Sequence, residues 1–213
     1  MKQPLEVCHL GRRPYGEVHV LQQRCLKDRI DGVIGDSLLL VEHDPIVTLG
    51  RGTEPHAADN VTVPVQAVER GGEATYHGPG QLVAYPILLL EEGNRDLHQY
   101  LRTLEKVVMN VLAGYGVQGR REAGKTGVWI EDLKVASIGV AVRRWVTWHG
   151  IALNVTTDLE AFKDFRPCGF ESNIMTRLAD HTDREVNMAQ VADEFITRFA
   201  GEFGYLKVVE LRS

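Results

Sequence analysis

Cys168 is the residue of this sequence best placed to act as a nucleophile. It lies in "FRPCGF", and a Pro-Cys-Gly turn presents the sulfur with little cover from other side chains. Buried cysteines usually act as small apolar side chains, which suits Cys8 on an expected strand and Cys25 on an expected helix. A reactive cysteine needs a cation or a helix N-terminus that lowers the pKa of its thiol. Cys168 is therefore either a structural thiol or the nucleophile of a cysteine enzyme.

Five residues could supply a charge or a base to that thiol: Lys134, His77, His149, Lys163 and Arg166. Lys134 interrupts the strand-like run "LKVASIGVAV", where an outward, solvated lysine would be ordinary. Lys134 is accordingly either a solvated strand residue or the partner of Cys168. A thioesterase-like dyad of Cys168 with His149 or His77 stays open at this stage.

The stretch "RGGEATYHGPGQ", residues 70–81, is expected to bend around a bound group, and the question is of what kind. Its glycines and its proline favour turns over a regular helix or a simple buried strand. It lacks G-x-G-x-x-G and precedes a strand, so it does not fit a dinucleotide site. His77 and His149 have no i+4 partner, and neither HExxH nor paired Cys/His spacing occurs, so the sequence predicts no metal site and no cofactor. An uncharged pocket with glycine walls remains.

The run "GRREAGKT", residues 119–126, matches the P-loop pattern G-x-x-x-x-G-K-[ST]. A working P-loop needs a following helix whose N-terminal amides hold phosphate. Here the β-rich run "GVWIEDLKVASIGV" follows instead. The sequence therefore predicts a basic hairpin loop at this position.

Several elements must position these residues. Helices are expected over residues 14–30, from the N-cap Asp96 to about Gly114, and from about Asn187 onward. The runs expected as strands are "DSLLLVEH", "IVTLGR", "LVAYPILLL", "TGVWI", "KVASIGVAV" and "TWHGIALNV". Strands outnumber helices without strict alternation, and no repeat or linker divides the chain. The prediction is one α+β domain over residues 1–213.

Composition narrows the class further. The chain has 213 residues, 44% hydrophobic and 25% charged, and its formal net charge of -5 gives no case for nucleic-acid binding. The longest apolar runs are too short for a bilayer, and the first residues lack the apolar stretch of a signal peptide. Three cysteines without a CxxC pair suit a reducing compartment. We expect a cytoplasmic protein with no membrane partner.

Six segments, in this order, resemble the lipoyl(octanoyl) transferases: "EHDPIVTLGR", "RGGEATYHGPGQLVAYP", "KTGVWI", "KVASIG", "WVTWHGIALNV" and "FRPCGF". The resemblance covers residues from about 15 to about 175. It implies the α+β fold shared with biotin and lipoate protein ligases, with a mixed β-sheet flanked by helices. The tail after about residue 180 is less diagnostic.

The resemblance also implies roles for individual residues. Cys168 matches the nucleophile that carries the acyl group as a thioester, and Lys134 matches the lysine paired with it. Relatives often have a glycine or a basic residue just before that lysine, whereas this chain has Asp132-Leu133. The matching substrate-binding residues are Arg70, Gly71, Gly72, Glu73, Ala74, Thr75, Tyr76, His77, Ser137, Ile138, Gly139, Gly150, Ile151 and Ala152.

The implied reaction has protein partners on both sides. The donor would be octanoyl-acyl carrier protein, and the acceptors would be lysines on lipoyl domains of 2-oxoacid dehydrogenase E2 subunits and on glycine-cleavage H protein. No cofactor is implied, and a monomer is expected. The partners are typically acidic, so the arginine pairs 12–13, 120–121 and 143–144 are candidate contacts as well as ordinary surface charges. Tyr76 and His77 would orient the acyl group.

Three alternatives stay open. An ATP-dependent lipoate or biotin protein ligase of the same fold would need no cysteine nucleophile. An amidotransferase would use the same thioester chemistry with another lipoyl-bearing protein as donor. A non-catalytic module would bind only acyl chains or acyl carrier protein.

Overall fold

The computed structural model describes residues 3–54, 56–59, 61–163 and 174–211. Within them, eight strands form a mixed sheet in the order β11-β1-β2-β6-β10-β9-β8-β7. The strands of this sheet are β1 (Leu5–Arg13), β2 (Ser37–His43), β6 (Gln81–Ile87), β7 (Arg120–Glu122), β8 (Lys125–Ile130), β9 (Leu133–Arg143), β10 (Val146–Asn154) and β11 (Val208–Leu211). β1 pairs in parallel with β2 and β11, and the other neighbours are antiparallel.

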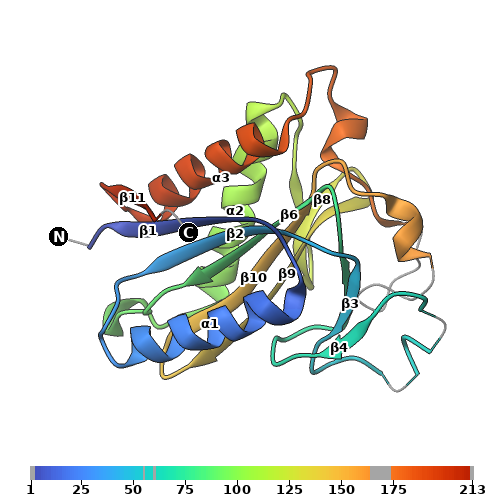
Figure 1. Cartoon of the computed structure of the whole chain (residues 1–213). Coiled ribbons are helices and arrows are strands. Elements are labelled where there is room, and N and C mark those ends of the chain that lie inside the picture. Colours follow the sequence, from blue (N-terminus) through green and yellow to red (C-terminus); the bar gives the residue numbers. More distant parts are fainter. Residues whose placement is uncertain (1–2, 55, 60, 164–173, 212–213) are drawn as a thin grey trace.

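A smaller sheet lies at one end of the large one (Figure 1). It contains β3 (Ile46–Leu49), β4 (Val65–Ala67) and β5 (Ala74–His77), with β3 in the middle. β5 is the middle part of the glycine-rich stretch 70–81, so residues 74–77 of that stretch belong to this sheet. The glycine-rich stretch is thus anchored by the pairing of β5 with β3 in the smaller sheet.

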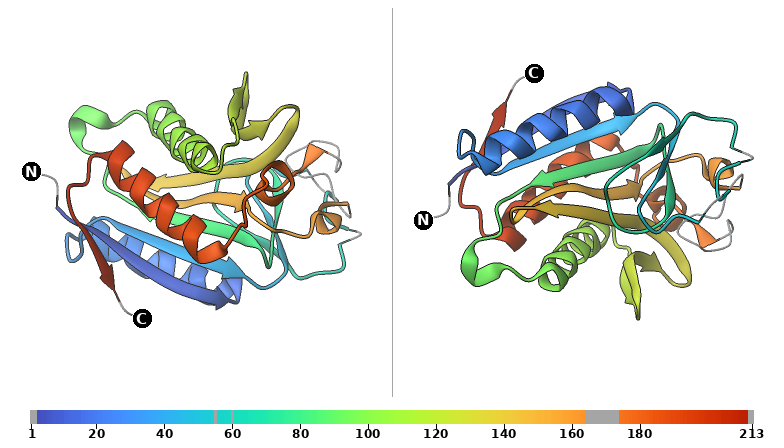
Figure 2. Two further views of the ribbon diagram at one scale, coloured as in Figure 1. Left: turned by 90° about the horizontal axis from the view of Figure 1, so that it is seen from above. Right: turned by 90° about the horizontal axis from the view of Figure 1, so that it is seen from below.

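Three long helices cover the large sheet: α1 (Tyr15–Ile30), α2 (Leu97–Gly114) and α3 (Met188–Phe203). Helices α2 and α3 lie together on one face and α1 lies on the other (Figures 1 and 2). Short 3-10 turns occur at Glu92–Asn94, Leu159–Phe162 and Leu178–His181. The mixed sheet flanked by helices confirms the fold expected from the resemblance.

The hydrophobic spacing of α2 explains its position. Leu104, Val108, Val111 and Leu112 lie on one stripe of the helix and are fully buried against the sheet. Asp96 caps the helix as expected, because its side chain accepts a hydrogen bond from the Gln99 amide at 3.0 Å. The helix thus begins beside the cavity described below.

All three expected helices and all six expected strand runs are found. Strands β4, β5, β7 and β11 were not expected. β4, β7 and β11 are short, and their residues are exposed or only half-buried, so they lack the run of buried apolar residues that marks a strand in a sequence. β5 is buried, and it corrects the expectation that the glycine-rich stretch contains no simple buried strand.

Candidate active site

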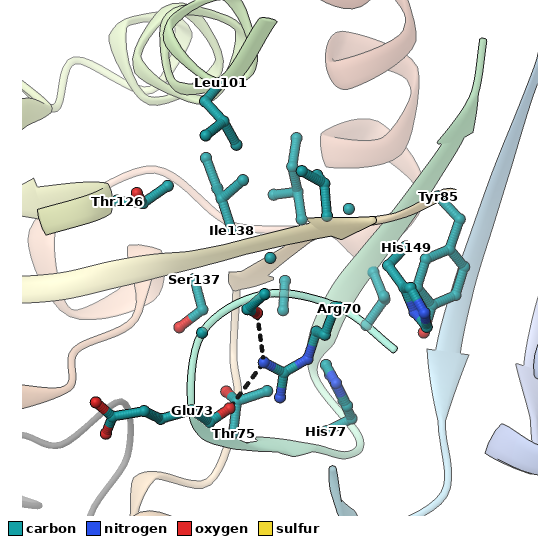
Figure 3. A pocket seen from close by; sticks show the side chains of 18 of the residues that line it. Arg70, Glu73, Thr75, His77, Tyr85, Leu101, Thr126, Ser137, Ile138 and His149 are labelled. Carbon is teal, nitrogen blue, oxygen red and sulfur yellow. Dashed lines mark hydrogen bonds between the residues drawn. The ribbon is translucent and has the colours of Figure 1, made fainter. Parts of the chain in front are cut away.

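A cavity of about 460 Å³ lies where β9 and β10 meet the glycine-rich stretch, the start of α2 and the β7–β8 turn. Lys134 and all of the expected substrate-binding residues except Ala74 and Tyr76 line it. Figure 3 shows Leu101 and Ile138 on one side of β9, and Ser137, Arg70 and His77 on the other. Residues from parts of the chain that lie far apart in the sequence therefore share one cavity.

Ala74 and Tyr76 correct the expectation from the sequence. Strand β5 alternates, so Thr75 and His77 face the cavity while Ala74 and Tyr76 face the opposite side. The Tyr76 ring packs edge-on against Phe162 with ring centres 5.4 Å apart. Tyr76 thus belongs to a small apolar cluster, and it does not supply a polar group to the cavity.

Arg70 shows what the glycine-rich segment bends around. Its buried guanidinium donates from Nη2 to the carbonyl and the hydroxyl of Thr48, both at 2.9 Å, and from Nη1 to the Glu73 carbonyl at 2.7 Å. A Cβ at Gly50 would stand 2.7 Å from Arg70 Nη1, so this glycine is needed for the close approach. The segment curls around its own arginine.

The glycines of the cavity wall serve two purposes. A Cβ at Gly150 would stand 2.2 Å from the Ala84 carbonyl oxygen, and one at Gly139 would stand 3.0 Å from Arg70 Cδ. Those two glycines let protein atoms approach each other. A Cβ at Gly71 would instead meet the Val140 carbonyl oxygen at 3.7 Å, an ordinary contact. Gly71 thus leaves room in the cavity, and unlike Gly72 and Gly124 it has no positive φ that would strain another residue there.

Lys134 is buried, with 3% of its surface exposed, and the interpretation as a solvated strand residue is wrong. Its Nζ lies 5.2 Å from the centre of the Trp129 ring on the neighbouring strand. Gly127 has a φ of +135°, and a Cβ there would stand 2.7 Å from Lys134 Cε. The glycine of "KTGVWI" thus makes room for the lysine stem, while the charge lies over an aromatic face.

His77 is fixed by a directed set of hydrogen bonds. The Gln81 amide nitrogen donates to the Tyr76 carbonyl and to Asn154 Oδ1, which leaves Gln81 Oε1 to accept from His77 Nδ1 at 2.8 Å. His77 Nε2 then accepts from the Thr48 hydroxyl at 3.2 Å. Burial, together with the neighbouring His43, lowers the pKa of His77 well below its ordinary value. His77 is a neutral, oriented group.

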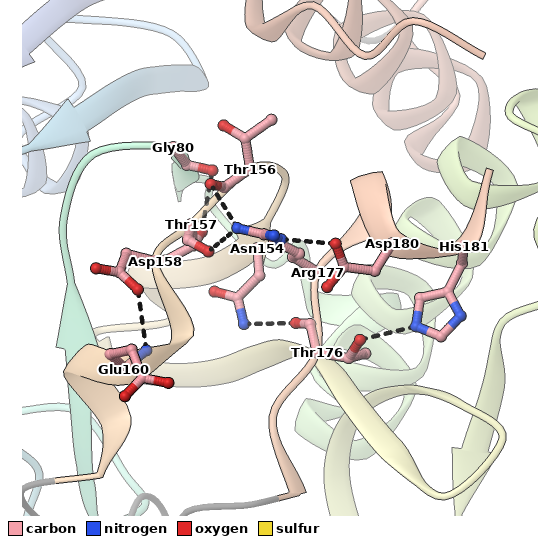
Figure 4. Close-up of polar contacts among 10 residues, drawn as sticks. All are labelled: Gly80, Asn154, Thr156, Thr157, Asp158, Glu160, Thr176, Arg177, Asp180 and His181. Carbon is pink, nitrogen blue, oxygen red and sulfur yellow. Dashed lines mark hydrogen bonds and ion pairs between the residues drawn. The ribbon is translucent and has the colours of Figure 1, made fainter. Parts of the chain in front are cut away.

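Asn154 continues this set toward the C-terminal part of the chain. Its amide nitrogen donates to the Thr176 carbonyl at 2.9 Å (Figure 4). The Thr176 amide in turn donates to the Lys134 carbonyl at 3.0 Å. Arg177 pairs with Asp180 at 2.8 Å and donates to the Thr157 carbonyl. Residues 174–181 are thereby held against the end of β10 and beside Lys134.

Cys168 and Arg166 lie outside the residues that the structure describes. The pairing of Cys168 with Lys134 therefore stays a prediction. On one side of that segment, Phe162 is fully buried against Tyr76. On the other side, Met175 forms a β-bridge with Lys134. Lys163, another candidate, is exposed and pairs with Glu160.

The supposed P-loop is the hairpin that its context predicted. β7 and β8 pair antiparallel, and the turn between them contributes Gly124, Lys125 and Thr126 to the cavity. Buried Glu105 of α2 anchors this hairpin, accepting from Arg121 at 2.8 Å and from the Gly127 amide at 3.3 Å. The hairpin is a wall of the cavity.

The adjacent arginines serve in part as internal ion pairs. Arg12 pairs with Asp44 at 2.7 Å, and Arg121 pairs with Glu105 at 2.8 Å. Arg120 pairs with Glu122 and with Asp132. The contacts of Arg12 and Arg120 are partly exposed surface pairs, as expected for such charges, whereas Arg121 pairs with a buried carboxylate.

Sequence reasoning missed several residues that hold the site: Tyr15, Gln22, Thr48, Gln81 and Asn154. Tyr15 and Gln22 lie seven residues apart on the face of α1 that packs on β10, and Gln22 Oε1 accepts from the His149 amide at 3.0 Å. The helical spacing of these two residues was the available signal, because both are buried. Thr48, Gln81 and Asn154 meet only through the pairing of strands far apart in sequence.

Comparisons with known proteins agree with this architecture. A bipartite lipoate protein ligase from Thermoplasma acidophilum superimposes with a TM-score of 0.73 at 17% identity, covering 100% of this chain and 87% of its own. A biotin protein ligase from Aquifex aeolicus gives 0.56 at 15% identity, with 96% and 70% covered. The fold is therefore that of the lipoate and biotin protein ligases.

Sequence similarity is more specific. The model of the lipoyl protein ligase A/B catalytic domain matches residues 14–200. An octanoyltransferase of Syntrophotalea carbinolica is 46% identical over 195 residues, covering 92% of each chain. The chain thus belongs to the lipoyl protein ligase A/B catalytic domain family and, within it, to the octanoyltransferases, so it is an acyltransferase. Within the described residues, no helix is long and apolar enough to cross a membrane.

Proposed function

We propose that this chain transfers an octanoyl group from octanoyl-acyl carrier protein to a lysine ε-amino group. The acceptors are lipoyl domains of 2-oxoacid dehydrogenase E2 subunits and glycine-cleavage H protein, and the enzyme works as a cytoplasmic monomer. The observation that carries the proposal is the buried Lys134 on the wall of an acyl-sized cavity, next to the chain that follows Cys168.

The reaction proceeds in two balanced steps. The Cys168 thiolate attacks the donor thioester, the acyl carbon gains a bond to the Cys168 sulfur and loses its bond to the carrier sulfur, and the carrier leaves as a thiol with a proton from the Lys134 ammonium group. The acceptor amine then attacks the enzyme thioester, the carbon–sulfur bond to Cys168 breaks and an amide forms, and the amine proton passes to Lys134, which restores the Cys168 thiolate and the Lys134 ammonium group. The first step exchanges one thioester for another, whereas the second forms a stable amide and is strongly downhill.

Lys134 serves both steps in this proposal. Its ammonium group stabilises the Cys168 thiolate, and its amine accepts the proton of the incoming acceptor lysine. Substrate is positioned by Arg70, Gly71, Gly72, Glu73, Thr75, His77, Ser137, Ile138, Gly139, Gly150, Ile151 and Ala152. The Gly71 amide already donates to the Val140 carbonyl at 2.9 Å, so the oxyanion takes its hydrogen bonds from other amides, among them the one that follows Cys168.

The cavity suits an octanoyl chain in size and chemistry. Its volume of about 460 Å³ falls within the range of small-molecule sites, and Leu101, Ile138 and Val140 provide apolar wall. Each buried methylene group contributes about 0.8 kcal/mol, so the chain supplies on the order of 5 kcal/mol before the cost of ordering it. No phosphate is needed to account for the glycine-rich stretch, because its arginine is engaged by Thr48 and Glu73.

Intact-protein mass spectrometry tests the proposal. The full chain is mixed with octanoyl-acyl carrier protein in the absence of ATP and added metal. We expect a mass gain of one octanoyl group on Cys168 that hydroxylamine removes and that Cys168→Ala abolishes. Addition of a lipoyl domain should then discharge the enzyme and acylate the acceptor lysine.

Other outcomes would identify the alternatives. Transfer that requires ATP and free octanoate would identify a ligase, and charging from octanoylated H protein in place of the carrier would identify an amidotransferase. Release of free octanoate without acceptor acylation would identify a thioesterase. Binding without an adduct under any of these conditions would leave an acyl-binding module.

A further inference from the structure

Three side chains meet at one wall of the cavity: His19 of α1, Glu69 ahead of the glycine-rich stretch, and His149 of β10, which itself lines the cavity. Glu69 Oε2 lies 3.0 Å from His19 Nε2 and 3.5 Å from His149 Nε2. Among the described residues, their ligand atoms form a group lying within 4.8 Å of one another. Fifty positions separate His19 from Glu69 and eighty more separate Glu69 from His149, so no short sequence motif announces them.

His149 carries the clearest sign that this meeting is specific. Its side chain is 1% exposed, and within the described part of the chain its Nε2 makes no hydrogen bond. Its φ of +55° lies in the left-handed region, which costs a residue other than glycine free energy in the middle of a strand. His149 Nε2 is therefore a buried nitrogen without a hydrogen bond, on a strained backbone and facing a carboxylate. This combination indicates a binding site for a ligand.

Helix α1 positions both histidines of this group. His19 stacks on the Trp148 ring with ring centres 5.8 Å apart, and Gln22, one turn later, binds the His149 amide at 3.0 Å. The same helix thus fixes one histidine directly and the backbone of the other. Preorganised ligands of this kind favour metal binding, because little side-chain entropy remains to be lost.

We infer that His19, Glu69 and His149 form a binding site for a divalent transition-metal ion, of which Zn²⁺ fits best. Two imidazoles and one carboxylate are a common three-ligand set for zinc, with a fourth position left for water or another ligand. Two imidazoles on one tetrahedral ion have ring centres roughly 5 Å apart by the usual bond lengths. The His19 and His149 rings are 5.8 Å apart here.

Protonation and access agree with this assignment. Burial, followed by the nearness of His19, lowers the pKa of His149 to about 3, so its nitrogens are neutral and able to bind metal at neutral pH. The Glu69 side chain is 38% exposed, which gives an ion a path from solvent to the buried histidine. A plain ion pair between His19 and Glu69 would leave His149 Nε2 unsatisfied, whereas a shared ion satisfies all three groups.

This inference goes beyond the proposed transfer reaction and does not depend on it, because binding is measured on the protein without substrates. The full chain is stripped with a chelator and dialysed against Zn²⁺ in the presence of a competing chelator, and bound metal is counted. Glu69→Gln keeps the shape of the side chain but removes its charge. His19→Phe keeps a ring on Trp148 but removes the nitrogen.

The matched control is His56→Ala. His56 pairs with Asp59 at 2.7 Å on the exposed surface, so it is a histidine–carboxylate pair without a third ligand. We expect one bound Zn²⁺ per chain, at least tenfold weaker binding in Glu69→Gln and His19→Phe, and unchanged binding in His56→Ala. Zn²⁺ should also raise the unfolding temperature of the unaltered chain and of His56→Ala, but not of the two site variants.

Three results would overturn the inference. The first is that the unaltered chain binds no stoichiometric Zn²⁺. The second is that both site variants bind Zn²⁺ as tightly as the unaltered chain. The third is that His56→Ala weakens binding as much as the site variants do. Circular dichroism separates loss of the site from loss of the fold. If one site variant fails to fold, the other still decides, because each removes a ligand from a different element of the structure.

Discussion

Lys134 is a buried basic side chain, and its burial is the basis of the acid–base role proposed for it. A lysine in this position keeps its stem beside Gly127 and its charge over Trp129, within reach of the cavity. Lys134→Met preserves most of the side-chain volume and removes the amine. We expect octanoyl transfer to fall by at least a hundredfold, in the range of general acid–base catalysis, while the unfolding temperature stays within a few degrees.

The control for this change is Lys27→Met. Lys27 lies on α1 and pairs with Asp31 on the exposed surface, so its loss should change neither transfer nor stability appreciably. Transfer is measured from octanoyl-acyl carrier protein to a lipoyl domain. Full activity of Lys134→Met would refute the role given to Lys134 and would turn attention to the cavity histidines.

Gly71 is the residue at which chain length can be tested. A Cβ there has ordinary room beside the Val140 carbonyl, so Gly71→Ala should fold normally. Gly71→Leu places four carbon atoms in the cavity. Excluding two methylene groups of the acyl chain costs about 1.6 kcal/mol, so we expect hexanoyl to be favoured over octanoyl by roughly fifteenfold relative to the unaltered chain. Competition between acyl donors measures this ratio, and equal loss for both chains would contradict the assigned orientation.

At the scale of elements, β6 and β10 approach each other so closely that a glycine is required. Gly150→Ala would bring a Cβ to 2.2 Å from the Ala84 carbonyl oxygen, forcing the two strands apart. We expect a loss of about 3 kcal/mol in the free energy of unfolding, at the upper end of overpacking effects. Gly201→Ala in α3 makes the same chemical change with no atom within 4 Å, and it should stabilise by about 0.5–1 kcal/mol. Urea unfolding of both variants checks the opposite signs.

The helices and the longer strands were accessible from the sequence, whereas the contacts between them were not. Asp96 and the apolar spacing after it fix α2 locally, and alternation in "KVASIGVAV" fixes β9. The burial of Lys134 could not be foreseen, since it depends on Gly127 of another strand making room. Likewise, the inward and outward faces of β5 follow from its pairing with β3, which assigns His77 to the cavity and Tyr76 to the opposite side.

Across the whole molecule, the site depends on buried histidines that must stay neutral. His43 is fully buried, donating from Nδ1 to the Arg13 carbonyl at 3.0 Å and accepting the Tyr85 hydroxyl at Nε2 at 2.8 Å. Burial lowers the pKa of His43 to about 4, and it lowers that of His77 in the same direction. His43 and His77 lie where α1, β2 and the smaller sheet meet around the cavity. Protonation of either histidine should therefore lower the stability of the whole fold.

The sign of the resulting pH dependence follows from linkage. An unfolded histidine binds its proton near pH 6.5, while folded His43 resists protonation until about pH 4, so stability is lost as the pH falls through this window. The loss from His43 alone amounts to about 3 kcal/mol. His43→Gln can keep one donor and one acceptor but cannot titrate, so its unfolding free energy should fall less between pH 6.5 and 4. The unfolding free energy is measured against pH in the presence of a chelator, with the exposed His56→Gln as control. If its slope between pH 6.5 and 4 is the same in His43→Gln as in the unaltered chain, His43 is not the group responsible.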